Sequence, residues 1–458
     1  MRERPHQNRP VLLRFALPAL LGLASRGFLY GVPSATAPPS VPCLRASQFF
    51  EIANSLDSAS GLGDAYDAAV QLAFGGDPHQ LTAFEENQAF IYASGALPTG
   101  ATRRLIILRP SIFVIDDQER SPDLLCLSSE SEPKILPGRV QVQTGEREIV
   151  WETVLPEEAR YAAQRPAGYT VTLQAARSVG RFLHLFYVAQ RGRTVPSTLT
   201  SEHGQWKLTV PGQERVFDLW LPDPSAGAGE IAISTPSGES TMSRRPLPSG
   251  ILPHGPEGSG LLETWDADYR GKQPPAWDIG RAADELQKLV REGAVRQGSV
   301  VDLGCGSGTD AIFLSSHGFT VTGIDISPTA LGLAEEKARK AGVSVRWILA
   351  DVTAPPKLGP FDFIYDRGCY HNVRDQSLEA YLETVHQFSH AGTKLLVLSA
   401  RRDAQSPAGS SGVSEEELRF DFSPFFDVEW LREIVLESNE LSVKAPGWSA
   451  LLRRNDKP

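Results

Sequence analysis

The sequence predicts two folds in one chain, an all-β antiparallel sandwich followed by a doubly wound α/β domain with a mostly parallel sheet. Short β-rich runs bounded by Gly, Pro, Asp or Ser occupy the first half, as in sandwich proteins. A stretch dense in Pro, Gly and Ser then interrupts the chain. Beyond this stretch, strand and helix patterns alternate, which is typical of βαβ units with helices on both faces of a sheet.

Length and composition indicate a soluble protein with more than one domain. The chain has 458 residues, which is more than one hydrophobic core usually holds. Its 45 basic and 55 acidic side chains give a net charge of -10, so we expect no nucleic-acid partner. The four cysteines, Cys43, Cys126, Cys305 and Cys369, are scattered and lack CxxC spacing. We therefore predict reduced thiols.

Residues 1–43 are predicted to be a signal-like or disordered extension. Arginines precede the apolar run FALPALLGLA, and the motif SATA, which ends at Ala37, has small residues at the spacing of a signal-cleavage site. Arg26 interrupts the apolar region and Pro38 follows the cleavage position, so an export or membrane-tether signal and a disordered extension both stay open. The run is shorter than the about 20 apolar residues that cross a membrane.

Residues 44–235 are predicted to form the sandwich. A short helix and turns are expected before residue 81, and strands follow. The expected strands are residues 103–110, 111–117, 138–145, 147–155, 168–176, 180–190, 204–212, 215–222 and 229–235. A linker follows at residues 236–260, and its composition can bury little apolar surface.

Residues 261–458 are predicted to form the α/β domain. The expected helices are residues 279–293, 308–317, 328–341 and 376–390, and the expected strands are residues 299–304, 319–326, 344–352, 361–368 and 393–400. Ligands of such sheets bind beyond the carboxyl ends of the strands, where glycines let a cofactor approach the backbone. This places a ligand site at residues 302–310.

The turn after the first of these strands reads DLGCGSGTD. Asp302 precedes Gly304, Gly306 and Gly308, which spell GxGxG. A nicotinamide dinucleotide site instead has GxGxxG spacing and an acid about 20 residues further on. The spacing therefore disfavours a dehydrogenase, which remains a third option.

This turn resembles motif I of the class I S-adenosylmethionine-dependent methyltransferases, and the resemblance extends along residues 260–458. It implies a Rossmann-like, seven-stranded sheet whose last strands form an antiparallel edge. It also implies that Asp325, in VTGIDIS, accepts hydrogen bonds from the ribose, and that Asp351 and Val352, in LADV, recognise the adenine. The cofactor-binding residues implied by the resemblance are Trp265, Trp277, Asp302, Gly304, Cys305, Gly306, Gly308, Asp325, Ile326, Asp351 and Val352.

Two further stretches resemble the thiopurine, thiol and tellurite-resistance branch of this family. They are WDADYRGKQPPAWDIGR, which in that branch closes over the cofactor, and YDRGCYHNV, whose equivalent lines the methyl-transfer site. The second stretch gives the catalytic candidates. Arg367 would stabilise an anionic nucleophile, and Asp366 or His371 would accept a proton.

Structural interpretations of these residues stay open beside the functional ones. Asp366 and Arg367 can pair with each other or with the backbone, and His371 can be a hydrogen-bonding wall residue. Trp265 and Trp277 can be core aromatics instead of a lid. Cys369 and His371 lack the further ligands that a metal needs, so we predict no metal.

The first half resembles the β-sandwich portion of heparinase II/III-like polysaccharide lyases. The resemblance lies in YASGALPTGATRRLIILRPSIFVIDD and in GRFLHLFYVAQ. In that family the catalytic Tyr and His lie largely on a preceding helical toroid, for which this chain has no room. The resemblance therefore implies a non-catalytic module with a possible polysaccharide contact.

The functional prediction is an S-adenosylmethionine-dependent methyltransferase that acts on a small-molecule nucleophile, with a thiol or chalcogen as the first choice. The alternative is a carbohydrate-binding or envelope-associated module with a vestigial methyltransferase domain, which the intact acids Asp302, Asp325 and Asp351 disfavour. A cytoplasmic location is favoured for the methyltransferase domain, and the signal-like segment leaves export or tethering open.

Overall fold

The structure is a computed structural model that describes most of the chain from residue 43 onward. The described ranges are 43–56, 65–118, 125–157, 159–165, 168–174, 180–190, 196–202, 205–223, 227–271, 273–402, 412–439 and 445–455. The run FALPALLGLA and the motif SATA lie outside them. No helix within these ranges is both long and apolar enough to cross a membrane. Residues 39–458 belong to one unit, and its β region (43–246) and α/β region (255–455) differ in architecture.

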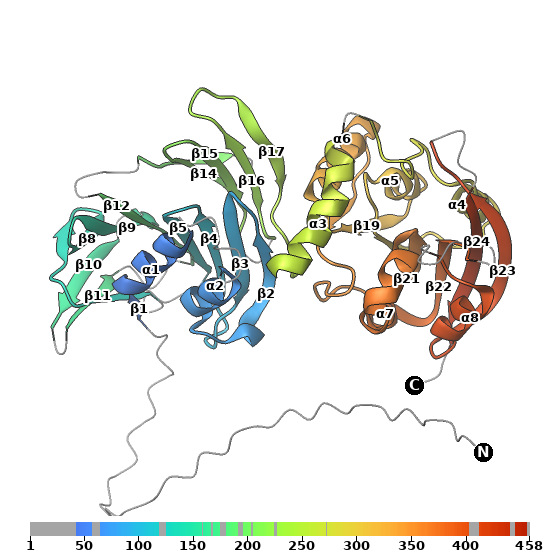
Figure 1. Cartoon of the computed structure of the whole chain (residues 1–458), viewed down its shortest axis with the longest axis horizontal. Coiled ribbons are helices and arrows are strands. Elements are labelled where there is room, and N and C mark those ends of the chain that lie inside the picture. The colour runs from blue at the N-terminus through green and yellow to red at the C-terminus, as the bar shows by residue number, and fades with distance from the viewer. Residues whose placement is uncertain are drawn as a thin grey trace, which may run out of the picture. The chain divides into compact units, whose positions relative to one another are not determined.

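The α/β region is built on a seven-stranded sheet (Figure 1). Its strands are β18 (Ser299–Leu303), β19 (Thr320–Asp325), β20 (Arg346–Leu349), β21 (Phe361–Arg367), β22 (Ser389–Ala400), β23 (Phe426–Leu436) and β24 (Ala445–Arg454). The spatial order is β20-β19-β18-β21-β22-β24-β23. The first five strands are parallel, and β24 pairs antiparallel with both β22 and β23. The predicted mostly parallel sheet with an antiparallel edge is confirmed.

Helices cover both faces of this sheet. Those in the described part of the region are α3 (Gly255–Arg270), α4 (Asp284–Arg291), α5 (Thr309–Ser316), α6 (Pro328–Ala341), α7 (Cys369–Gln387) and α8 (Glu415–Phe422). Successive strand residues point to opposite faces. Val300 therefore lies in the core that includes α4 and α5, and Val301 lies in the core that includes α7 and α8.

Two helices differ from the sequence prediction. Helix α3 begins inside the predicted linker, and α7 begins at Cys369 instead of near residue 376. The early start of α7 follows from Asp366, whose carboxylate accepts hydrogen bonds from the backbone amides of Cys369 and Tyr370. The predicted start lies next to Ser377, where the helix is broken by a non-helical residue with φ -147° and ψ 35°.

Gly308 is required by both the backbone and the packing at the start of α5. Its φ of +77° is left-handed, and a Cβ there would lie 2.5 Å from the Trp347 ring and 2.7 Å from the Ala334 Cβ. We expect Gly308→Ala to lower the free energy of unfolding by about 2–4 kcal/mol, because backbone strain adds to overpacking. Urea denaturation of the full chain measures this loss.

Gly342 provides a matched control for that substitution. It has a similar φ of +68° at the end of α6, but a Cβ there would meet nothing within 4 Å. Gly342→Ala should therefore cost only the backbone strain, about 1 kcal/mol. Equal losses for the two variants would show that packing against Trp347 does not restrict position 308.

The β region consists of four-, eight- and five-stranded sheets. Its elements are β1 (Leu44–Arg45), α1 (Ala46–Leu56), α2 (Ala65–Phe74), η1 (Pro78–Gln80), β2 (Leu81–Glu86), β3 (Phe90–Ala96), β4 (Thr102–Leu108), β5 (Ile112–Gln118), β6 (Cys126–Ser129), β7 (Lys134–Leu136), β8 (Arg139–Thr144), β9 (Arg147–Leu155), β10 (Arg160–Gln164), β11 (Tyr169–Gln174), β12 (Phe182–Gln190), β13 (Thr198–Glu202), β14 (Gln205–Pro211), β15 (Val216–Leu221), β16 (Glu230–Ser234) and β17 (Ser240–Pro246). Each of the nine predicted runs contains a strand. The region is thus largely β-sheet, as predicted.

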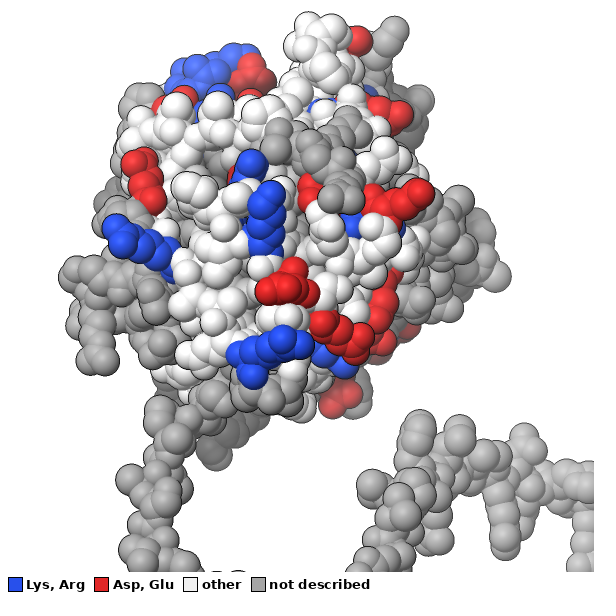
Figure 2. All heavy atoms as spheres, turned by 90° about the vertical axis from the view of Figure 1, so that its left-hand side faces the viewer, with Lys and Arg blue, Asp and Glu red and all other residues white. Residues whose placement is uncertain are grey.

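Apolar and ionic contacts connect the sheets of the β region. Side chains of the eight-stranded sheet, such as Tyr92 and Tyr187, share a core with Leu208 and Phe217 of the five-stranded sheet. Buried ion pairs join neighbouring strands, and Arg103 of β4 binds Asp117 of β5 at 2.7 Å. On the face shown in Figure 2, the Lys and Arg side chains are scattered and do not form a basic patch.

The predicted linker is more ordered and more buried than its composition indicated. Strand β17 lies within residues 236–260 and pairs antiparallel with β16. Leu247 and Leu252 are each only 1% exposed. The expectation that this stretch buries little apolar surface was therefore wrong, because pairing with β16 satisfies its backbone.

The prediction of reduced thiols was wrong for two of the four cysteines. Cys43 and Cys126 form a disulfide with a Cα–Cα distance of 4.7 Å. The parallel pairing of β1 with β6 places these residues side by side, and a contact across 83 residues of sequence leaves no local pattern. Cys305 and Cys369 are free thiols, as predicted.

Candidate active site

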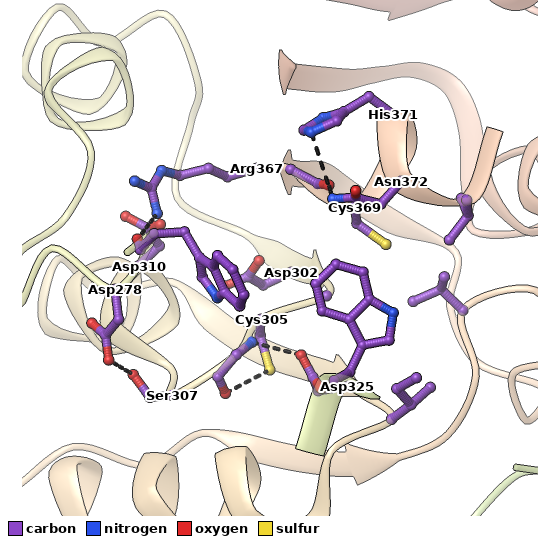
Figure 3. A pocket seen from close by; sticks show the side chains of 18 of the residues that line it. Asp278, Asp302, Cys305, Ser307, Asp310, Asp325, Arg367, Cys369, His371 and Asn372 are labelled. Atoms are coloured by element: carbon purple, nitrogen blue, oxygen red, sulfur yellow. Dashed lines mark hydrogen bonds between the residues drawn. The ribbon is translucent and has the colours of Figure 1, made fainter. Parts of the chain in front are cut away.

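A cavity of about 460 Å³ lies at the carboxyl ends of the parallel strands (Figure 3). This volume is within the range of small-molecule sites. Ten of the eleven predicted cofactor-binding residues line it, and Arg367 and His371 line it as well. Gly308 is the exception, because it caps α5 and is packed against Trp347 and Ala334.

The glycine turn exposes its backbone to the cavity. Gly304 and Gly306 have left-handed φ values of +67° and +54°. A Cβ on Gly306 would lie 2.5 Å from the Tyr269 hydroxyl oxygen, and one on Gly304 would lie 2.8 Å from the Cys369 Cβ. The turn is therefore a cradle that only glycine can form at these two positions.

Asp325, at the end of β19, is held in place by two backbone amides. Its Oδ2 accepts a hydrogen bond from the Gly306 amide at 2.7 Å, and its Oδ1 accepts one from the Ser327 amide at 2.8 Å. Burial raises the pKa of this carboxyl to about 6, against the effect of the two amides. The side chain joins the glycine turn to the neighbouring strand and keeps lone pairs for a ligand.

Asp302, at the end of β18, has an unsatisfied oxygen. The residue is 2% exposed, and its Oδ2 has no hydrogen-bond partner within the described residues. Burial raises its pKa well above the usual range, and Asp310 and Asp366 raise it further. A buried carboxylate oxygen without a partner is costly, so a donor or cation from a ligand would be stabilising here.

The remaining predicted cofactor residues form the walls of the cavity. Asp351 accepts hydrogen bonds at Oδ1 from the Thr353 amide and hydroxyl, at 2.8 and 2.7 Å. The Trp265 and Trp277 rings meet edge to face with centroids 5.7 Å apart. Trp277 is 39% exposed, so it is a wall residue at the rim and not part of the core.

Asp366 does not line the cavity, which contradicts its prediction as a proton acceptor. It is fully buried. Besides the amides at the start of α7, it accepts a hydrogen bond from the Tyr381 hydroxyl at 2.7 Å. Burial raises its pKa to about 7, but the carboxylate is used to cap the helix. A raised pKa is thus not a sign of catalysis here.

Arg367 and His371 line the cavity, and each also has a contact with the protein backbone. Arg367 donates to the carbonyl oxygens of Trp277 and Glu437 at 2.8 and 3.2 Å. His371 Nδ1 lies 3.3 Å from the backbone amide of Ala400, which can only donate, whereas its Nε2 lies 3.5 Å from the Asn372 Nδ2. Burial lowers the pKa of His371 to about 4, so it is neutral at pH 7 with its proton on Nε2. In this state it can donate a hydrogen bond but is not poised as a base.

Sequence reasoning missed three residues that shape the site. Asp278 accepts hydrogen bonds from Ser307 and Lys337, which ties the segment before α4 to the glycine turn. Tyr269 donates no bond to the turn but stands directly over Gly306, and burial raises its pKa. Both residues lie inside the stretch WDADYRGKQPPAWDIGR, from which only the tryptophans were selected.

Asp310 is the third missed residue. Its Oδ1 accepts from the Ala283 amide at 2.8 Å, and its Oδ2 accepts from the Tyr365 hydroxyl at 3.2 Å. It follows directly on the GxGxGT run, and its position in the first turn of α5 was the available signal. No group of three or more potential metal ligands occurs among the described residues.

The carboxylate acceptors of the cavity fit a cationic nucleoside cofactor. The lining acids outnumber the lining cations, and the acids are Asp278, Asp302, Asp310, Asp325, Asp351 and Glu437. S-adenosylmethionine carries a sulfonium, an ammonium group and ribose hydroxyls, all of which favour nearby carboxylates. The glycine cradle and the unsatisfied Asp302 oxygen match such a ligand at one end of the cavity.

Comparison with known proteins leads to the same class of enzyme. Residues 300–392 match a family described as a methyltransferase domain. The chain is 31% identical over 189 residues to 2-heptyl-1-hydroxyquinolin-4(1H)-one methyltransferase from Mycobacteroides abscessus, which covers 39% of this chain and 83% of that protein.

Solved structures of similar proteins were also found. One, described as concerning the conversion of a disulfide bond into a thioacetal group during echinomycin biosynthesis, is 28% identical with a TM-score of 0.39, and the match covers 43% of this chain and 93% of the other. Another is Burkholderia thailandensis 1,6-didemethyltoxoflavin-N1-methyltransferase with S-adenosylhomocysteine, at 17% identity and a TM-score of 0.36, over 50% and 96% of the two chains.

The fold and the sequence match define a class I α/β methyltransferase region in the second half of the chain. The chain belongs to the S-adenosylmethionine-dependent methyltransferases. It is an enzyme of this class, and its cofactor is S-adenosylmethionine.

Proposed function

We propose that the α/β region transfers a methyl group from S-adenosylmethionine to a small-molecule nucleophile bound in the same cavity. The observation that carries this proposal is the unsatisfied Asp302 oxygen beside the Gly304–Gly306 cradle. Asp325 ends β19, and Asp351 follows β20, the strand beside it. Both carboxylates line the same cavity. Three acids converging on one glycine cradle argue against a vestigial domain.

In this proposal each acid binds one part of the cofactor. Asp325 accepts hydrogen bonds from the ribose hydroxyls, since its two oxygens each retain a lone pair. Asp351 and the Val352 amide bind the adenine edge, and Asp302 binds the ammonium group of the methionine moiety. Trp265 and Trp277 cover the cofactor as aromatic walls. The guanidinium of Arg367 has N–H groups left for the methionine carboxylate, in place of the activating role that the sequence suggested.

The reaction requires alignment more than proton transfer. When bound, the cofactor supplies an activated methyl group, so the protein has to orient the acceptor and exclude water. His371 donates a hydrogen bond from Nε2 to an acceptor oxygen, sulfur or nitrogen and does not act as the base. The nucleophile is therefore proposed to react as an anion or with a free lone pair that it already has at neutral pH.

Two observations favour two different classes of methyl acceptor. The stretches YDRGCYHNV and WDADYRGKQPPAWDIGR favour the thiopurine, thiol and tellurite-resistance branch, and with it a thiol or chalcogen. The Mycobacteroides relative is named for a hydroxyquinolone, which favours an acidic hydroxyl on a planar heterocycle. Both acceptor types react without an enzyme base, as the neutral His371 requires.

Calorimetry and product analysis test this function. The full chain should bind S-adenosylmethionine and not NADH. It should then transfer the methyl group to members of a panel that contains thiols, selenide and N-hydroxyquinolones, with mass spectrometry of the products. Binding of NADH alone would instead support the dehydrogenase, and binding of neither cofactor would leave the carbohydrate-binding alternative.

The titration of Asp325 predicts a pH dependence of cofactor binding. Its pKa is about 6 in the ligand-free protein because the carboxyl is buried. Asp302 and Asp266 are the acidic neighbours on the adjoining elements. The ribose hydroxyls donate to the ionised carboxylate, so protonation of Asp325 should lower the affinity by up to about tenfold per pH unit below that pKa. Calorimetry from pH 5 to pH 8 measures the dependence.

Asp325→Asn is the control for this dependence. The amide keeps the shape of the side chain but does not titrate, so its weaker affinity should change less between pH 5 and pH 7. Circular dichroism at each pH separates this effect from acid unfolding. An affinity of the unmodified protein that is independent of pH through 6 would contradict the assignment.

For the first half we propose a non-catalytic module that follows the extension 1–43. Its expected end at residue 235 moves to Pro246, because β17 pairs with β16. The expected start of the methyltransferase domain at residue 261 moves to Gly255, where α3 begins. The resemblance to the sandwich of heparinase II/III-like proteins supports this proposal and implies a polysaccharide contact. Affinity electrophoresis of the full chain in gels that contain acidic polysaccharides tests it. Unchanged migration in all such gels would contradict the contact.

A further inference from the structure

The cavity is closed on one side by the strap, which we define as residues 273–281. The strap leads from α3 to α4 and contributes Trp277 and Asp278 to the lining. Pro274 and Pro275 have no backbone N–H, so the strap makes few bonds of its own, and one of these joins the Asp278 amide to the Pro275 carbonyl at 2.9 Å. Its position therefore depends on contacts from neighbouring elements.

Asn439, just beyond the end of β23, makes four hydrogen bonds to the strap. Its Nδ2 donates to the carbonyl oxygens of Pro274, Pro275 and Asp278 at 3.3, 2.9 and 3.1 Å. Its backbone amide donates to the Ala276 carbonyl at 2.9 Å. One exposed side chain, whose two N–H groups are shared among three carbonyl oxygens, thus contacts a single segment at three points.

Three further groups act with Asn439 on the same segment, and one of them is the Glu437 carboxylate, which binds the Arg281 guanidinium of the strap. The Ser438 hydroxyl donates to the Ala276 carbonyl at 3.1 Å, and Arg367 donates to the Trp277 carbonyl. On the inner side, Asp278 is bound by Ser307 and Lys337. The strap is consequently held from the glycine turn and from the antiparallel edge at once. Asn439 belongs to the outer attachment and does not itself line the cavity.

We propose that Asn439 is a positioning residue that keeps the strap closed over bound cofactor and so sets the rate of cofactor release. The inference rests on the proposed cofactor site. Trp277 is the partly exposed rim residue of the strap, so in this proposal the cofactor leaves the cavity past its ring. Loss of the Asn439 bonds frees three carbonyls to water at little cost, so the strap opens more often while the fold persists.

The test compares Asn439→Ala and Asn439→Asp with the unmodified protein. Asp keeps the size of the side chain but removes both Nδ2 donors. Dissociation of S-adenosylhomocysteine is followed by intrinsic tryptophan fluorescence, to which Trp265 and Trp277 at the cavity contribute, in a stopped-flow displacement experiment. Both variants should dissociate about tenfold faster. In the ligand-free protein, hydrogen exchange should accelerate for the strap amides and not for those of the sheet.

Asn455→Ala is the matched control, because Asn455 is a partly buried asparagine near the C-terminal end of β24 whose side chain contacts Asp427 and Arg454. It should leave the dissociation rate unchanged. An unchanged dissociation rate in both Asn439 variants would overturn the positioning role. A faster rate would also overturn it if the free energy of unfolding of the ligand-free variant fell by as much as the free-energy barrier to dissociation. If the unmodified protein binds no S-adenosylhomocysteine, the failure is that of the proposed cofactor site.

Discussion

Replacing Asp325 by alanine is expected to weaken S-adenosylmethionine binding at least about 100-fold. In the proposed site this carboxylate accepts two ribose hydroxyls, and a hydrogen bond to a charged group contributes about 1.5–3 kcal/mol. The variant also leaves the Gly306 and Ser327 amides without their acceptor, which loosens the glycine cradle. Since 1.4 kcal/mol corresponds to a tenfold change in affinity, two lost bonds account for the expected magnitude. Calorimetry of the full chain measures it.

Asp268→Ala is the matched control for that experiment. Asp268 is an exposed carboxylate on α3, so its removal changes the net charge by the same amount without touching the cavity. Its affinity should stay close to that of the unmodified protein. If Asp325→Ala bound as tightly as this control, the proposed ribose contact would be wrong and the cofactor would have to lie elsewhere in the cavity.

The cofactor end of the site could be predicted because its residues follow strands that are evident in the sequence. Asp302 and Asp325 each end a run of apolar residues, and parallel strands bring their carboxyl ends to one edge of the sheet. The glycines at 304 and 306 mark the turn directly. The site could therefore be predicted from local sequence patterns, because neighbouring parallel strands place these residues together and no long-range contact had to be known.

The acceptor end could not be predicted in the same way. Asp366 and Arg367 are adjacent in the sequence, but one caps α7 and the other faces the cavity. The state of His371 depends on the Ala400 amide of another strand. Asn439 reaches the strap across more than 160 positions of sequence. Each of these roles arises from a contact between distant segments, which composition and local spacing do not encode.

The buried acids of the site also affect stability. The pKa of Asp325 is raised to about 6 in the folded chain, so the protonated form is favoured by folding. Its contribution to stability is therefore present at low pH and is lost as the pH rises through about 6. At neutral pH a cationic cofactor compensates for this loss, since it binds the ionised carboxylates of the folded chain only. Cofactor binding and folding are thus coupled through the same side chains.

Opening the Cys43–Cys126 disulfide is expected to lower the stability of the β region by about 4 kcal/mol. The bond closes a loop with a sequence separation of 83, and cross-linking a loop of this length removes a large part of the unfolded chain's entropy. It also attaches β1 to β6, where the two strands share only two residue pairs. Such a short parallel ladder has little stability of its own.

Denaturant unfolding of the full chain with and without a thiol reductant measures this effect, with hydrogen exchange of the β6 and β11 amides to locate it. The variant Cys43→Ser/Cys126→Ser should resemble the reduced protein and should not respond to reductant. Cys305 and Cys369 are free in both forms, so a response that persists in the variant would belong to them and would contradict the prediction.

A disulfide persists in an oxidising environment, whereas the cofactor of the second half is a cytosolic metabolite. If reduction leaves the β region folded and cofactor binding intact, the chain can work in either environment. If reduction unfolds the β region, the β region is stable only in an oxidising compartment, whereas the cofactor is supplied in the cytosol.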